Sequence, residues 1–285
     1  MSLGINGLDH VVIRVSDLNA AEALYRRLGF TLTPRGFHVG RGSANHTAPL
    51  SGGNYFELIH IEPSSERDNF FPDHRGAVAI ALAPDGSRAL HEEITRLGYD
   101  VEPPRDLARP VNLPGGTREA RFLNATLPTI GPDAVRYFAC QHLTRDLVWR
   151  PEWEGHANGA VRLTEAILVH PGPKVLEAAY RGLFQGLVQV ESDSLRVIVG
   201  GDTISLLSPA KFSARFPDVP LPPDLSRGWF AGTALRVRSL RATDEFLRQT
   251  GMPTTRTPSG SFVVAPAEAA GALLEFHAVD VRRPR

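Results

Sequence analysis

The sequence predicts an α+β protein built from four β-α-β-β-β modules that follow one another along the chain. The first observation behind this prediction is that residues 8–63 have the pattern of a strand, a helix and three strands, and the second is that this order returns three more times. The third is the spacing of the glycines after the predicted helices. Gly29 and Gly98 are 69 residues apart, and Gly251 follows 153 residues later, about two such periods.

The first module has the clearest pattern. Its opening strand is predicted over residues 8–15, where β-branched residues alternate with others. A helix follows, because apolar residues recur in helical spacing from Ala21 to Leu28, with Asn19 as the expected N-cap and Gly29 at the end. Three further strands are expected at 31–34, 43–50 and 54–61.

The other three modules repeat this order with weaker signals. Module two has strands at 77–83, 119–127 and 135–141 and a helix over 90–97; module three has strands at 163–169, 195–199 and 203–207 and a helix over 176–183; module four has strands at 233–237, 261–264 and 273–277 and a helix around 246–247.

Proline- and glycine-rich segments divide the chain. Residues 150–159 separate the two pairs of modules, so we expect an N-terminal domain over 4–150 and a C-terminal domain over 160–280. Residues 208–228 separate modules three and four. Residues 102–116 are predicted to form a loop that interrupts module two and covers a cleft.

The composition of the 285 residues excludes several classes of function. A formal net charge of zero and a pI near 7.2 disfavour nucleic-acid binding. No window approaches the ~18–20 apolar residues of a membrane span, and the first residues lack the pattern of a secretory signal. The one cysteine, Cys140, permits no internal disulfide and is expected to be a small buried apolar residue. We therefore expect a cytoplasmic monomer or homodimer whose partner is a small molecule.

The sequence resembles the vicinal oxygen chelate superfamily, which includes glyoxalase I and extradiol dioxygenases, and more narrowly the glyoxalase-like domain proteins. The resemblance lies in four motifs of module one, at 8–12, 17–18, 28–30 and 55–58, and in the segments 42–46 and 149–159. It implies that each pair of modules forms a curved mixed sheet, a cup that holds a metal and a substrate.

The same resemblance implies metal ligands on the first and last strands of a module, and the matching residues are His10 and Glu57. A third ligand is expected from His142 or from His46. Histidine and carboxylate ligands suit Zn, Fe(II), Mn or Ni. Alternation along the first strand places His10 on one face with Val12 and Arg14.

Module two weakens the metal hypothesis. Its first strand carries Ala77, Ala79 and Ala81, and no register supplies a ligand there. Module three has Glu165 and module four has Glu275 in comparable places, so neither half repeats the full pattern. A metal-bound site and a metal-free ligand-binding protein both stay open.

The expected function is that of a glyoxalase-like enzyme, of lyase or isomerase type, acting on a small oxygen-rich organic substrate. Glu57 or His46 would move the proton. The alternatives are a metal-free protein that binds and sequesters a small molecule, and a ring-cleaving dioxygenase. The expected substrate-binding residues are Arg14, Arg41, Asn45 and Tyr55, whereas His38 and His60 are expected to face solvent.

Overall fold

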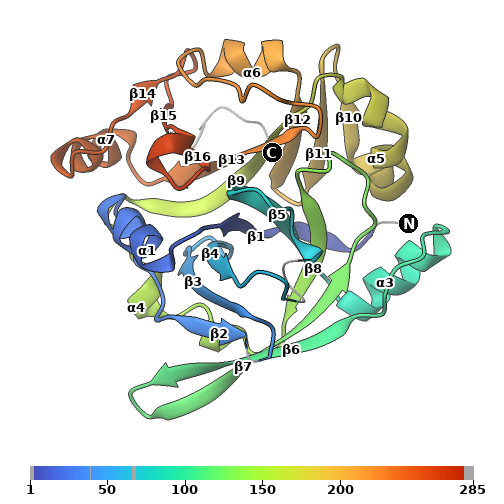
Figure 1. Ribbon diagram of the computed structural model, residues 1–285, viewed down its shortest axis with the longest axis horizontal. Coiled ribbons are helices and arrows are strands. Elements are labelled where there is room, and N and C mark those ends of the chain that lie inside the picture. The colour runs from blue at the N-terminus through green and yellow to red at the C-terminus, as the bar shows by residue number, and fades with distance from the viewer. Residues whose placement is uncertain (1–2, 39, 66–68, 279–285) are drawn as a thin grey trace.

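Two eight-stranded sheets form the frame of the protein in a computed structural model that describes residues 3–38, 40–65 and 69–278 (Figure 1). The strands of the first sheet are β1 (Ile5–Arg14), β2 (Gly36–His38), β3 (Ser43–Pro49), β4 (Tyr55–Ile61), β5 (Gly76–Pro84), β6 (Arg105–Leu113), β7 (Gly116–Thr126) and β8 (Arg136–His142). Those of the second are β9 (Ala160–Val169), β10 (Val188–Val190), β11 (Ser194–Val199), β12 (Asp202–Leu207), β13 (Trp229–Val237), β14 (Thr255–Arg256), β15 (Phe262–Val264) and β16 (Leu273–His277).

Helices follow the first strand of each module and also occur in the connections. The α-helices are α1 (Leu18–Arg27), α3 (Ser87–Arg96), α4 (Pro151–Glu154), α5 (Glu177–Phe184), α6 (Pro209–Arg215) and α7 (Leu240–Gln249). Short 3-10 helices are η1 (Arg145–Leu147), η2 (Pro173–Leu176), η3 (Gln185–Leu187) and η4 (Pro266–Glu268). None of the described helices is long and apolar enough to cross a membrane.

The topology confirms the predicted fold class. The strand order is β2-β3-β4-β1-β5-β8-β7-β6 in the first sheet and β10-β11-β12-β9-β13-β16-β15-β14 in the second. Within a module, the first and last strands are parallel neighbours, as β1 and β4 are, because the helix carries the chain back across the sheet. Two modules join through their first strands, β1 with β5 and β9 with β13, which run antiparallel.

Three local predictions are wrong. Residues 31–34 form no strand, and β2 begins instead at Gly36. Helix α1 is capped by Asp17 rather than by Asn19, because the Asp17 carboxylate accepts hydrogen bonds from the backbone N–H groups of residues 19 and 20. The expected loop at 102–116 is largely strand β6, paired with β7. Its exposed, polar residues and Pro110 hide the strand pattern, as is typical of an edge strand.

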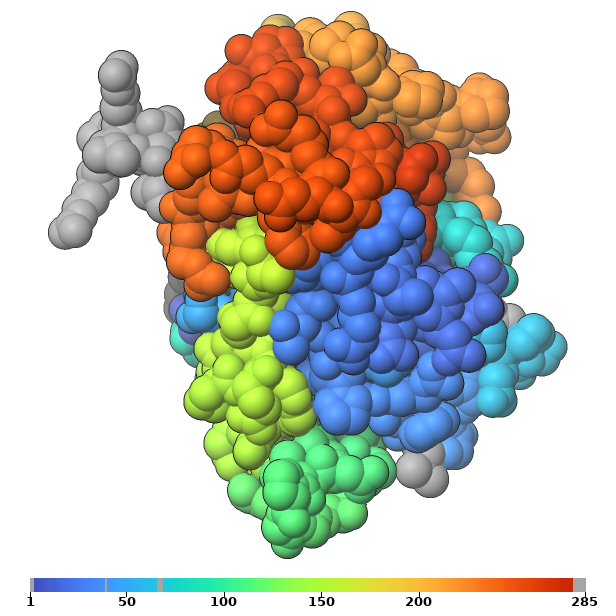
Figure 2. Space-filling view, turned by 90° about the vertical axis from the view of Figure 1, so that its left-hand side faces the viewer, coloured from blue at the N-terminus to red at the C-terminus, as the bar shows by residue number. Residues whose placement is uncertain are grey.

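One hydrophobic core joins the two halves. It contains residues from the back of both sheets, such as Val11 and Phe56 from the first and Leu168 and Phe276 from the second, with helices packed between them. The chain around residue 150, yellow-green in Figure 2, runs along the side of the molecule between the green β6–β7 hairpin and the orange C-terminal half. The strands of each sheet lie within the predicted ranges 4–150 and 160–280. Because the two sheets share one core, the division into two independent domains stays a prediction.

The halves also meet backbone to backbone at Gly76 and Gly271. A Cβ atom at Gly76 would lie 2.3 Å from the carbonyl oxygen of Gly271, and both residues have positive φ angles, 102° and 87°. Only glycine permits both the contact and the backbone conformation.

Candidate functional site

The front face of the first sheet, opposite the shared core, carries the polar residues of module one. Alternation turns Val11 and Ile13 toward the core and His10 and Val12 to this face, which we call the first cup. Glu57 reaches the same cup from β4, so His10 and Glu57 line one cavity, as the alternation predicts. Nε2 of His10 lies 3.8 Å from Oε2 of Glu57, and both side chains are almost fully buried.

Asp9 fixes the orientation of His10. Its Oδ1 atom lies 2.6 Å from Nδ1 of His10, and the ring stacks on Tyr55 with a centroid distance of 4.3 Å. Burial by itself raises the pKa of the Asp9 carboxyl, but the imidazoles of His142 and His10 outweigh it and hold that pKa well below its usual range. With Nδ1 held by a carboxylate, Nε2 of His10 is the atom presented to the cavity.

Glu57 is held from the other side. Its Oε1 atom accepts a hydrogen bond of 2.5 Å from Nδ2 of Asn45 and lies 3.9 Å from Nε2 of His38. The side chain of His38 is only 12% exposed and lines the cavity, so the prediction that it faces solvent is wrong. The Ser43 hydroxyl contacts Nδ1 of His38 at 3.0 Å, which turns Nε2 toward Glu57.

The cavity has a small polar end and a larger apolar end. The polar chamber, of about 40 Å³, is lined by His10, Glu57 and Asn45, whose Oδ1 atom is buried without a hydrogen-bond donor among the described residues. An adjoining cavity of about 340 Å³ shares the residues Leu107, Asn124 and Phe138 with it. The larger cavity is lined further by Arg41, Asn69, Phe70, Phe71, Glu102, Arg105, Ala125 and Thr126.

Arg109 is a residue of this site that the sequence did not reveal. It lies on β6, which pairs with β7 at the edge of the sheet, and it lines the polar chamber. It is only 6% exposed, and burial lowers the pKa of its guanidinium, although Tyr55 and Glu57 oppose that effect. The sequence does contain a signal for Arg109, because this arginine lies within residues 102–116, the segment predicted to cover a cleft.

Two predicted site histidines lie elsewhere. His46 is on the back of the sheet, where Nδ1 contacts the carbonyl oxygen of Thr33 at 2.8 Å and Nε2 lies 3.3 Å from Glu22 of α1. His142 is near His10, but its Nε2 atom lies 3.1 Å from Asp9 and 3.7 Å from the sulfur of Cys140. His46 therefore cannot join the His10–Glu57 pair, and His142 belongs to a neighbouring group.

The predicted substrate-binding residues are partly brought together. Asn45 and Tyr55 line the polar chamber, and Arg41 lines the larger cavity. Arg14 lines neither of these cavities, because it is buried beyond Val12 and donates a hydrogen bond of 2.9 Å to the carbonyl oxygen of Pro72.

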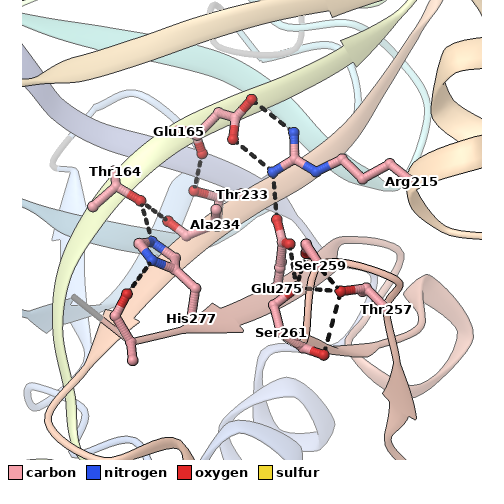
Figure 3. A network of polar contacts seen from close by, with 11 residues as sticks. Thr164, Glu165, Arg215, Thr233, Ala234, Thr257, Ser259, Ser261, Glu275 and His277 are labelled. Atoms are coloured by element: carbon pink, nitrogen blue, oxygen red, sulfur yellow. Dashed lines mark hydrogen bonds and ion pairs between the residues drawn. The ribbon is translucent and has the colours of Figure 1, made fainter. Parts of the chain in front are cut away.

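The corresponding face of the second sheet, the second cup, is filled. Phe212 of α6 and Phe216 and Val219 after it pack against apolar residues of the second sheet. Figure 3 shows Arg215 reaching from α6 to two carboxylates, with bonds of 2.7 Å to Glu165 and 2.5 Å to Glu275. Burial raises the pKa of Glu165, but Arg215 outweighs it and lowers that pKa. This cup holds no unpaired charge among these three groups.

The donor atoms of the first cup fit part of a metal site. A divalent ion with bonds of ~2.0–2.2 Å can bridge ligand atoms up to about 4 Å apart, which covers the 3.8 Å between His10 and Glu57. Among the described residues, the three that bring ligand atoms within 4.8 Å of one another are Asp9, Cys140 and His142. The strand β5 contributes Val78, Ala79 and Ala81 to the cup, and none of these side chains can bind a metal; a register shift turns Ala77 to the core.

Comparisons with known proteins agree with this architecture. The family model described as a glyoxalase-like domain matches residues 8–184, whereas no curated protein matches the chain significantly. A hypothetical protein from Staphylococcus aureus superposes with a TM-score of 0.65 at 10% identity, over 96% of this chain and 99% of that one. A mutant of 4-hydroxymandelate synthase from Streptomyces coelicolor gives 0.60 at 12% identity, over 99% and 95%. The Mn(II)-bound glyoxalase from Novosphingobium aromaticivorans gives 0.54 at 15% identity, over 96% and 82%. At these identities the three structures show a shared fold alone.

Proposed function

Because the chain belongs to the glyoxalase-like domain family, we propose that its first cup is the active site of a metal-assisted enzyme, of lyase or isomerase type, for a small oxygen-rich organic substrate. The observation that carries this proposal is the buried His10–Glu57 pair at the polar end of a cavity. An imidazole and a carboxylate kept out of solvent beside a cavity are typical of a catalytic site.

His10 and Glu57 would hold the divalent ion through Nε2 and Oε2. When bound, the ion supplies Lewis-acid stabilisation of negative charge on a substrate oxygen. Two protein ligands leave the remaining coordination positions to water or substrate, which is the open arrangement that a catalytic site requires. Asp9 acts as a positioning residue, because it holds the ring of His10 by Nδ1.

Glu57 is the group that moves the proton. Its carboxylate would accept a proton from a carbon next to a substrate carbonyl and return it to a neighbouring atom. Asn45 fixes Oε1 of that carboxylate and presents its own Oδ1 atom as an acceptor for a substrate hydroxyl. Tyr55 and Phe138, packed on His10, keep water from the polar end.

A metal-free binding protein is the second candidate. It is favoured by Ala79 and Ala81, which stand in the first cup where a second module would place further ligands. A ring-cleaving dioxygenase that uses the C-terminal half finds less support, because α6 and Arg215 fill the second cup.

Calorimetric titration of untagged, chelator-treated protein with Mn, Fe(II), Zn and Ni tests the proposal. We expect binding that the double variant His10→Ala/Glu57→Ala loses by at least ~100-fold, because few other ligands are present. His60→Ala is the matched control, since His60 lies on β4 between Ile59 and Ile61 and points to the opposite face. Binding that survives the double substitution places the ion elsewhere, and no binding by the unmodified protein favours the metal-free candidate.

A further inference from the structure

The side chain of Arg109 is inserted into the polar chamber from the edge of the sheet. It passes over Gly36 of β2, where a Cβ atom would lie 2.9 Å from Nη1 of Arg109 and 2.5 Å from Oδ1 of Asn45. Any side chain at residue 36 would therefore displace both groups. Because Asn45 also contacts Glu57, Arg109 reaches the same wall that holds the proposed base.

No group in the described part of the chain pairs with this guanidinium. Arg109 has neither a hydrogen bond nor an ion pair there, and Tyr55, Glu57 and Cys140 act on it only through longer-range electrostatics. A buried, unpaired cation opposes folding. A purely structural arginine would have partners, as Arg215 does in the second cup.

We propose that Arg109 binds the carboxylate of the substrate, so that the enzyme acts on organic monocarboxylates. A guanidinium matches a planar carboxylate with two parallel hydrogen bonds. A phosphate fits less well, because the chamber is small, about 40 Å³, and is already lined by the carboxylate of Glu57, which repels a dianion more strongly than a monoanion. This inference rests on the proposed function of the first cup.

The rest of the ligand would occupy the adjoining cavity. That cavity measures about 340 Å³, within the lower range of small-molecule sites, and Phe70, Phe71 and Phe138 give it apolar walls. A carboxylate at Arg109 thus places the neighbouring carbon atoms near Glu57 and an apolar group among the phenylalanines. The expected ligand combines one carboxylate with a compact apolar body.

Two probes of similar shape, one negatively charged and one neutral, test whether the charge of the ligand determines binding. 3-Phenylpropanoate carries the carboxylate and the apolar ring, and 3-phenylpropanamide is its neutral analogue. Calorimetry on chelator-treated protein should show the acid binding at least ~10-fold more tightly than the amide, as expected for a charge-assisted hydrogen bond. Arg109→Gln should reduce that ratio to about one, and Arg109→Lys should restore part of it.

Arg118→Gln is the matched control. It removes the same charge from the neighbouring strand β7, but the Arg118 side chain is 58% exposed, lies 3.2 Å from Asp146 and lines neither cavity. We expect it to leave the acid-to-amide ratio unchanged. Equal binding of acid and amide, or a preference that Arg109→Gln retains, overturns the proposal, as does no binding of the acid at ~10 mM, where a Kd of ~1 mM already gives near saturation.

The stability of Arg109→Gln gives an independent readout. Because no partner is lost, its midpoint of urea unfolding should equal or exceed that of the unmodified protein. A lower midpoint assigns Arg109 a structural role and contradicts the inference. The probes are measured without metal, so the two proposals can fail separately. If the protein binds metal but does not prefer the acid, only the role of Arg109 is rejected. If it prefers the acid but binds no metal, only the metal-assisted function is rejected.

Discussion

The two cups are built on the same strand order but are completed differently. In the first, a cavity remains in front of the sheet, and Arg109 enters it without a partner among the residues that the structure describes. In the second, α6 fills the corresponding space and Arg215 is paired with Glu165 and Glu275. The two sheets therefore form equivalent cups. The segments that pass in front of each sheet determine whether the cup keeps a cavity for a ligand.

Each cup also distributes its polar groups differently. In the second, Ser261 donates a hydrogen bond of 2.6 Å to Glu275, so even the second oxygen of that carboxylate is satisfied. In the first, the acceptor Oδ1 of Asn45 is buried without a donor in the described part of the chain. Unsatisfied buried groups reduce stability, and at a binding site the ligand compensates for them.

The largest expected effect is the removal of Arg215. Arg215→Met should lower the free energy of unfolding by about 3–5 kcal/mol, because it leaves the buried Glu275 and the largely buried Glu165 without a cation. Urea denaturation measures this loss. The triple variant Arg215→Met/Glu165→Gln/Glu275→Gln should recover most of it, and a single variant as stable as the unmodified protein would remove the contrast with Arg109.

An acid-dependent loss of stability is expected at the segment between the halves. His156 accepts a hydrogen bond from the backbone N–H of Thr31 and donates one from Nε2 to the carbonyl oxygen of Pro49. Burial lowers the pKa of His156 from 6.5 to about 4; the bond to Pro49 opposes this, and Arg238 reinforces it. Between these values the unfolded chain binds a proton that the folded chain does not, so the free energy of unfolding falls as the pH drops.

The loss should reach roughly 3 kcal/mol between pH 6.5 and pH 4. Urea denaturation at several pH values measures it. The variant His156→Gln should be less stable at pH 7 but should lack this part of the pH dependence. An unchanged pH profile in the variant would show that His156 is not the group responsible.

Asp9 tests the metal site proposed in the first cup, because it holds the ring of His10 by Nδ1. Asp9→Asn should weaken metal binding by about 10–100-fold, since it replaces the carboxylate that orients His10 with a neutral amide. Calorimetric titration measures the change. His46→Ala is the control, because His46 lies on the back of the sheet and should leave the affinity as it is. Equal affinities in all three proteins would contradict the role of Asp9.

The smallest effect is expected where the two halves share a hydrogen bond. The hydroxyl of Tyr180 on α5 donates to the carbonyl oxygen of Gly131, so the Tyr137 hydroxyl on β8 must donate to Tyr180, at 2.8 Å. Tyr137→Phe should lower the free energy of unfolding by about 1 kcal/mol. A single unfolding transition in both proteins would indicate that the halves unfold together, whereas two transitions would support separate domains.

The fold was largely predictable from the sequence, because alternating strands, helical stripes and glycine stops repeat along the chain. The positions of His10 and Glu57 on one face also follow from alternation. The place of Arg109 in the site could not be predicted, because Arg109 lies on the edge strand β6, whose exposed polar residues hide the strand pattern. The separation of His142 from the His10–Glu57 pair was also hidden, since it depends on Asp9, which is turned toward both rings by a shift of register in β1.

Anomalous X-ray diffraction from crystals grown with Mn²⁺ and 3-phenylpropanoate tests most directly that the first cup is the working site. We expect one manganese peak between Nε2 of His10 and Glu57, with the carboxylate of the acid on Arg109 and the ring beside Phe138. We expect no manganese and no ligand in the second cup, where Arg215 already pairs with both carboxylates. Manganese at Asp9, Cys140 and His142, or either molecule in the second cup, would contradict this claim.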